Sequence, residues 1–196
     1  MSKVYFTSDL HFGHEKLLTM GKGRPFKTIQ EHDKTIIDNW NKKVEAGSDI
    51  YILGDIFFKG YTEQDMERVF QSLHGRKHII LGNHDKKNPL LRLKERGIVQ
   101  TVEDYYEREL KTSDGRKIFL VLCHFPILEF NRAYKDNSLM LYGHIHNIAN
   151  YDNIYKDLGF RAYHVGVDTN NFTPVSLDEI VRRIKWKTAV YPRICI

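Results

Sequence analysis

The first half of the chain alternates short apolar runs with longer amphipathic segments. Three β-branched and aromatic runs are typical of buried strands: residues 3–8, 49–53 and 77–81. Apolar residues at helical spacing follow each run, over residues 28–44, 62–74 and 89–96. This alternation predicts βαβ units around a parallel sheet.

The ends of the helical segments carry typical capping residues. Thr28 with Glu31 three residues later predicts a capping box at the first helix. Asn88 is expected to cap the third helix, with Pro89 at its first position and Gly97 after its last turn.

The second half has a different character. Residues 99–110 and 117–122 are expected to be strands of a hairpin, because they flank Ser113-Asp114-Gly115 and Asp-Gly favours a tight turn. Further short strands are expected at 139–142 and 161–167. A last helix is expected from Ser176, capped with Glu179, to about residue 186. Tyr151 and Tyr155 are expected on an exposed loop. With no repeat or linker, residues 1–196 are expected to form a single α/β domain of mixed strand direction.

Composition supports an ordinary globular protein. The 196 residues are 41% hydrophobic and 28% charged. The apolar runs are far shorter than the ~18–20 residues that a membrane span needs. The N-terminus lacks the features of a signal peptide, and two cysteines cannot form a disulfide framework. We therefore expect a cytoplasmic protein with no membrane association. The net charge of +5 comes from scattered basic pairs, so nucleic acid is a possible partner that the charge pattern does not specifically indicate.

Polar motifs stand where the predicted strands end. There are five: Asp9-Leu10-His11, Gly54-Asp55, Gly82-Asn83-His84-Asp85, His124 and Gly143-His144-Ile145-His146. Each alone has an ordinary structural explanation. In an open α/β sheet, however, ligands bind outside the carboxyl ends of the strands. Five such motifs therefore predict one site at that edge.

The donor types indicate metal chemistry. Carboxylate, imidazole and carboxamide groups without thiolate suit Mn²⁺, Fe²⁺, Zn²⁺ or Ni²⁺, and we favour Mn²⁺. A pair of divalent ions about 3.5–4 Å apart needs a bridging anion, which Asp55 can supply. In a regular strand, His144 and His146 would point to opposite faces. Either the chain bends after Gly143 or the metals lie on either side of this segment.

In this order, the five motifs resemble those of the calcineurin-like metallophosphoesterase family. The resemblance runs from Asp9 to His146, and the opening segment from Ser8 to His14 is similar to a compact bacterial and phage-type subgroup. It implies a four-layer αββα sandwich of two mixed β-sheets flanked by helices.

The resemblance also implies roles for individual residues. One metal would be held by Asp9, His11, Asp55 and His146, and the other by Asp55, Asn83, His124 and His144, with Asp55 bridging. His84 corresponds to the histidine that protonates the leaving group or stabilises charge at the phosphate. Asp85 would orient His84.

The implied activity is hydrolysis of a phosphate ester by a hydroxide that bridges two metal ions. The residues after the second and third motifs argue against a protein phosphatase, since Gly54-Asp55 continues Ile56-Phe57-Phe58 and the third motif ends in Asp85. We favour a phosphodiester or nucleotide-like small substrate. The alternatives are a broad-specificity phosphomonoesterase, and a nucleic-acid-binding protein with secondary nuclease activity. The oligomeric state is left open.

Three residues are candidates for binding substrate. His14 either contacts substrate or caps the following helix. Arg24 either pairs with a phosphate or forms a structural salt bridge. Arg132 lies in the long segment between His124 and the last motif, which is a candidate to overhang the site. His164 has no metal-ligand spacing and is expected to be structural.

Overall fold

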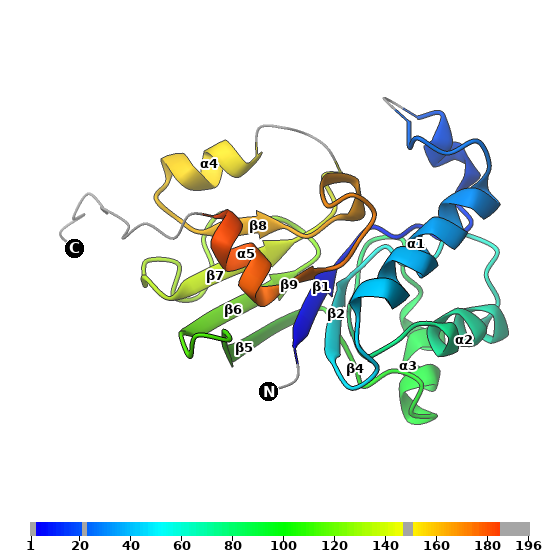
Figure 1. Cartoon of the computed structure of the whole chain (residues 1–196), viewed down its shortest axis with the longest axis horizontal. Coiled ribbons are helices and arrows are strands. Elements are labelled where there is room, and N and C mark those ends of the chain that lie inside the picture. Colours follow the sequence, from blue (N-terminus) through cyan, green and yellow to red (C-terminus); the bar gives the residue numbers. More distant parts are fainter. Residues whose placement is uncertain (1–2, 21–22, 147–150, 185–196) are drawn as a thin grey trace.

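Two β-sheets pack against each other with helices on their outer sides (Figure 1). The computed structural model describes residues 3–20, 23–146 and 151–184. The expected four-layer α/β sandwich is confirmed.

The first sheet has the strand order β4-β3-β2-β1-β9. Its strands are β1 (Val4–Thr7), β2 (Asp49–Leu53), β3 (Arg76–Ile80), β4 (Thr101–Glu103) and β9 (Val175–Ser176). The first four are parallel and β9 is antiparallel to β1. The carboxyl ends of β1, β2 and β3 therefore meet at one edge.

The second sheet has the order β5-β6-β7-β8. Its strands are β5 (Tyr105–Lys111), β6 (Lys117–Cys123), β7 (Ser138–Tyr142) and β8 (Ala162–His164). The hairpin expected around Asp114-Gly115 joins β5 to β6. The single strand expected over residues 99–110 is wrong, because the chain leaves the first sheet after Glu103 and enters the second at Tyr105.

Helices complete the outer layers. On the first sheet lie α1 (Ile29–Lys43), α2 (Glu63–Ser72) and α3 (Lys87–Glu95). The short α4 (Tyr151–Asp157) packs on the second sheet, and α5 (Leu177–Arg183) closes the core between the sheets. Two 3₁₀ turns, η1 (Glu15–Leu18) and η2 (Val167–Thr169), lie in connecting segments.

Alternation along the strands builds this layering. In β2, Ile50 and Ile52 face the helices, whereas Tyr51 and Leu53 face the second sheet. In β6, every second side chain packs between the two sheets. The side chains that alternate with these, Val121 among them, point to the other face of the sheet and pack under α4. Both faces of these strands are buried, so their register is strongly specified and the polar residues that follow them are fixed at one edge.

Of the three helix ends, one was predicted correctly, one in part and one wrongly. The Ser176–Glu179 capping box is confirmed, with both bonds present. At α1, the Thr28 hydroxyl accepts from the backbone N–H of Glu31 as expected, but the Glu31 carboxylate accepts from the N–H of Lys27 at 2.9 Å instead of that of Thr28, so the capping box is half formed. Helix α3 begins at Lys87, so Pro89 lies in its first turn rather than at its first position. Proline is tolerated there because the first four N–H groups of a helix have no partner within the helix.

The loop expected around Tyr151 and Tyr155 is instead α4. Tyr155 is 1% exposed, and its hydroxyl donates to the carbonyl of Ile127 at 2.9 Å. The expected end of the last helix near residue 186 lies outside the described residues.

Candidate metal centre

Six of the seven predicted ligands form two compact groups at the carboxyl edge of the strands. Asp9, His11 and His146 each place one donor atom within 4.8 Å of the others. Asp55, His124 and His144 do the same. Residues from loops up to 137 positions apart are thus brought to two adjacent points.

Asp55 connects the two groups. Its Oδ2 lies 3.6 Å from His11 Nε2 in the first group and 3.5 Å from His124 Nε2 in its own. Its other oxygen, Oδ1, accepts a hydrogen bond of 2.9 Å from the backbone N–H of His84. The carboxylate is therefore held with one oxygen between the two sets of imidazoles.

Asn83, the seventh predicted ligand, joins the second group. Its Oδ1 lies 3.1 Å from His124 Nε2 and 3.0 Å from His144 Nδ1. The second group therefore combines carboxylate, carboxamide and imidazole donors, and the first combines carboxylate and imidazole.

The loops that carry these residues adopt an unusual backbone. Eight non-glycine residues in the described ranges have positive φ, and five of them are predicted ligands: Asp9, His11, Asp55, His144 and His146. Asp and His enter the left-handed region more readily than most residues, but at a cost in energy. The left-handed turns at 144 and 146 also let two histidines at alternating positions serve separate groups.

Glycines make room for the donors. A Cβ on Gly54 would lie 2.5 Å from Gly82 N and 2.6 Å from His124 Nδ1. A Cβ on Gly143 would lie 2.7 Å from Asp9 Oδ2. These positions require glycine because donor side chains and neighbouring loops approach the backbone itself.

A family model for calcineurin-like phosphoesterases matches residues 2–164. The chain belongs to this family. Related proteins extend over nearly the same length. An uncharacterized protein of Methanocaldococcus jannaschii is 29% identical and covers 94% of this chain and 93% of its own length. The Gene 66 protein of Mycobacterium phage D29 is 30% identical, covering 86% of this chain and 89% of its own.

A solved structure agrees. The crystal structure of a protein of unknown function from Aquifex aeolicus has a TM-score of 0.70 and 25% identity, over 93% of this chain and all of that one. The resemblance to a compact, phage-type phosphoesterase is therefore confirmed. No helix in the described part of this phosphoesterase has the length and apolar character of a membrane span.

The residues of the phosphoesterase fit divalent metal ions. His11 Nε2 is buried, has no hydrogen-bond partner, and points towards Asp55. Burial lowers the pKa of His11 to about 2, and the positive charge of Arg24 adds to this effect, so the ring is a neutral base at physiological pH. Burial raises the pKa of Asp9, because removal from water disfavours the charged carboxylate. A cation beside Asp9 would offset this penalty and keep the carboxylate ionised.

His84 lies at the open side of the groups. Its side chain is exposed, and its ring centroid is 5.4 Å from that of His11. It follows Asn83 directly, so the tight turn that presents the carboxamide also presents this imidazole.

Asp85 does not orient His84, and that prediction is wrong. Its carboxylate accepts three backbone hydrogen bonds, from Gly82 at 2.8 Å, Asp55 at 2.9 Å and Ile56 at 3.0 Å. Burial raises the pKa of Asp85 to about 6, against the effect of these three N–H groups. Asp85 therefore ties the loop after β3 to the loop after β2.

His14 lies beside the metal groups, the position that a contact with substrate, one of its two interpretations, requires. Its Nδ1 is 3.4 Å from His11 Nδ1, and its ring stacks on Phe58 with centroids 3.5 Å apart. It also precedes η1 but makes no side-chain cap there.

For Arg24, the structure shows the structural salt bridge, one of its two interpretations, and not the contact with a phosphate. Arg24 is 5% exposed, and its guanidinium pairs with Asp168. Arg132 does not overhang the site, and that prediction is wrong. Its guanidinium lies 4.3 Å from the ring centroid of Phe119, near the start of β6, whereas the metal groups lie beyond the end of that strand.

Sequence reasoning missed two neighbours of the first group. Asp168 Oδ2 lies 2.8 Å from His146 Nδ1. His164, expected to be merely structural, has its buried Nε2 without a hydrogen-bond partner and 3.9 Å from Asp9 Oδ2. Burial lowers the pKa of His164 to about 4. The signal was available, since His164-Val165-Gly166-Val167-Asp168 repeats the pattern of polar residues and glycine after a strand.

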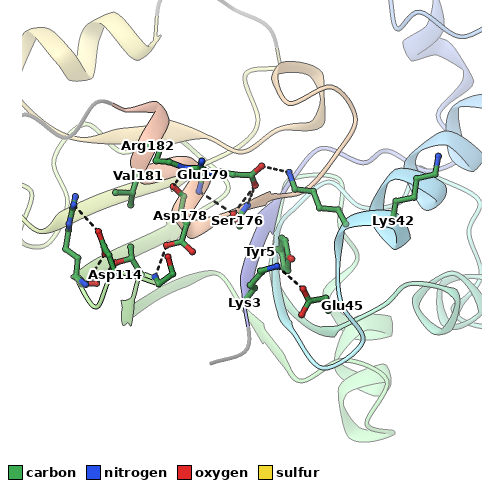
Figure 2. A pocket seen from close by; sticks show the side chains of 14 residues that line it. Lys3, Tyr5, Lys42, Glu45, Asp114, Ser176, Asp178, Glu179, Val181 and Arg182 are labelled. Atoms are coloured by element: carbon green, nitrogen blue, oxygen red, sulfur yellow. Dashed lines mark hydrogen bonds and ion pairs between the residues drawn. The ribbon is translucent and has the colours of Figure 1, made fainter.

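A large surface hollow lies elsewhere. It measures about 1030 Å³ and is found at the start of β1, beside Lys3 and Tyr5, at the opposite edge of the first sheet (Figure 2). Several of its charged residues pair with one another, as in Lys3–Glu45 at 2.9 Å and Lys43–Glu179 at 2.8 Å. It shares no residue with the metal groups.

Proposed function

We propose that this phosphoesterase uses two divalent metal ions, with Mn²⁺ favoured, to hydrolyse a phosphodiester or nucleotide-like substrate. The observation that carries the proposal is the position of Asp55 Oδ2, between the imidazoles of His11 and His124. One carboxylate oxygen shared by two donor groups is the arrangement that a pair of cations requires.

The seven donors would hold the ions, four to each with Asp55 common to both. Bound divalent ions would lower the pKa of water towards neutrality and offset the negative charge of the phosphate. The chain itself fixes the donors before substrate arrives. Asp9 is fully buried and receives hydrogen bonds from Ser8 Oγ at 2.6 Å and from the backbone N–H of His144 at 3.0 Å.

His84 would supply the proton that the departing alkoxide takes up. The side chain is exposed to incoming substrate while its backbone is anchored to Asp55. A general acid in such a position contributes about 10²–10⁴-fold to a rate.

The preference for a diester is supported by aromatic surfaces at the mouth of the site. Phe125 is 44% exposed, and its ring centroid lies 4.8 Å from that of His144. On the side of the first group, the partly exposed ring of Phe58 stacks on the buried ring of His14 and offers a second aromatic surface. A diester carries a second organic group that such surfaces can bind, and nucleobases stack well on aromatic rings.

A rate comparison on metal-depleted and Mn²⁺-reloaded protein tests the proposal. We expect depleted protein to be inactive, and reloaded protein to hydrolyse bis(p-nitrophenyl) phosphate with a higher kcat/KM than p-nitrophenyl phosphate. A panel of nucleotide diesters would follow. Equal activity with and without metal would contradict the metal mechanism, and a preference for the monoester would favour the phosphomonoesterase alternative.

The nucleic-acid alternative has a separate readout. Binding to DNA or RNA through phosphate contacts would weaken steeply with salt, with a slope of about −0.9 per contact on duplex DNA. We expect weak binding without such a slope. Tight, salt-dependent binding that does not need Mn²⁺ would favour a nucleic-acid-binding protein.

A further inference from the structure

A buried network links Arg24 directly to the first metal group. The Arg24 guanidinium donates to both oxygens of Asp168, each at 2.9 Å. It also donates to the backbone carbonyls of Asp9 at 2.6 Å and Leu10 at 3.0 Å, and to His32 Nε2 at 2.7 Å. Guanidinium has five N–H donors, and this geometry uses all five.

Asp168 connects Arg24 to His146, one of the predicted metal ligands. Its Oδ2 lies 2.8 Å from His146 Nδ1, so this nitrogen carries the proton and donates it to the carboxylate. The lone pair of His146 is then left on Nε2. A carboxylate behind an imidazole in this way fixes both its tautomer and its orientation.

A second branch of the network leads from Arg24 to the loop after β1. Because His32 Nε2 accepts from Arg24, His32 Nδ1 is the donor to Asp33 Oδ1, at 2.7 Å. Asp33 Oδ2 in turn accepts from the backbone N–H of Gly13, at 3.0 Å. The loop that holds Asp9 and His11 in left-handed conformations is therefore anchored at both ends.

In the described residues, the side chains of Arg24 and Asp168 make no direct hydrogen bond to Asp55, His124 or His144. In residues 3–20, 23–146 and 151–184, the hydrogen bonds of Arg24 and Asp168 go to the first loop, to His32 and to His146. Asp168 also lies beyond residues 2–164, the segment matched by the family model.

We propose that Asp168, held by Arg24, is a positioning residue that sets the metal affinity of the Asp9–His11–His146 group and leaves that of the Asp55–His124–His144 group unchanged. This inference rests on the proposed function, because it takes both groups to be metal sites. The two metals would consequently differ in how firmly the protein holds them.

The Asp168→Asn variant tests this role. An amide has one acceptor oxygen in place of two, so it cannot keep the full fork from Arg24 together with the bond from His146. Mn²⁺ binding is measured by calorimetry in two backgrounds. In His144→Ala, which damages the second group, the remaining Mn²⁺ reports on the first. In His11→Ala, it reports on the second.

We expect Asp168→Asn to weaken Mn²⁺ binding about 10–100-fold in the His144→Ala background and to leave it unchanged in the His11→Ala background. The matched control is Asp49→Asn. Asp49 also pairs with an arginine and a histidine, Arg76 at 2.7 Å and His78 at 3.2 Å, but at the start of β2, away from both groups. It should change Mn²⁺ binding in neither background.

The outcomes are distinguishable. A wild-type protein that binds no Mn²⁺ contradicts the proposed function and this inference with it. Normal wild-type binding, with an equal loss in both backgrounds or in neither, contradicts only the positioning role. If the Asn variant does not fold, ¹⁵N spectra of the Zn²⁺-loaded wild-type protein decide the question: His146 should be protonated at Nδ1, and a proton on Nε2 would overturn the proposal.

Discussion

Asp55 Oδ2 lies 3.6 Å from His11 Nε2, a buried nitrogen that has no hydrogen-bond partner. The two residues come from loops after different strands, and the same oxygen faces His124 in the second group. Replacing Asp55 should therefore affect both metal groups at once.

We expect Asp55→Asn to lose close to both equivalents of bound Mn²⁺, and nearly all activity, because a neutral amide cannot offset two cations. Metal content measured by atomic emission after gel filtration checks this. Loss of only one equivalent would show that Asp55 serves a single metal. Asp49→Asn, an equally conservative change at the far end of β2, should retain both.

His84→Ala should keep its metal and lose turnover. The side chain is exposed and belongs to neither ligand group. We expect about 10²–10⁴-fold slower hydrolysis of a diester with a poor leaving group. The loss should be smaller with p-nitrophenol as leaving group, because that alcohol departs without needing a proton. An emptied metal site in this variant would instead make His84 a ligand.

Asp85→Asn should reduce stability rather than change the pH profile of catalysis. Asp85 accepts backbone bonds from Gly82, Asp55 and Ile56, and an amide cannot accept all three in the same geometry. We expect a loss of about 1–3 kcal/mol in the free energy of unfolding, measured by urea titration of metal-free protein. Unchanged stability with a shifted pH optimum would restore the role of orienting His84.

Sequence patterns predicted the metal ligands better than the residues that hold those ligands in place, for a physical reason. Parallel strands bring their carboxyl ends together whatever their side chains are, so the meeting of Asp9, Asp55 and Asn83 followed from strand order. The partner of Arg24 did not, because Asp168 is 144 residues away and nothing local to either residue selects the other. Similarly, the backbone bonds to Asp85 depend on how two loops approach each other in space.

Gly54→Ala should be among the most damaging single changes in the chain. Gly54 has φ +81°, and an added Cβ would meet Gly82 N at 2.5 Å and His124 Nδ1 at 2.6 Å. Gly97 offers a matched control, since it has φ +74° with nothing within 4 Å of an added Cβ. We expect about 1–2 kcal/mol of destabilisation for Gly97→Ala from backbone strain alone, and at least about 3 kcal/mol for Gly54→Ala, where a clash is added. Equal losses in urea titrations would mean that the loops after β2 and β3 can separate without cost.

The ion pair between Lys43 and Glu179 should make stability depend on acid pH. Glu179 Oε1 accepts from Lys43 at 2.8 Å, and its Oε2 accepts from the backbone and hydroxyl of Ser176. Burial would raise the pKa of Glu179, but the bonds from Lys43 and Ser176 outweigh it and lower the pKa from 4.5 to about 2.

A carboxylate with a depressed folded-state pKa stabilises the fold above its unfolded pKa, and this contribution is lost as the pH falls towards the folded value. We therefore expect the difference in stability between wild type and Glu179→Gln, measured by urea titration, to be full above about pH 5 and to shrink steadily towards pH 2. A difference that stays constant over this range would mean that Glu179 acts through its hydrogen-bond geometry and not through its charge.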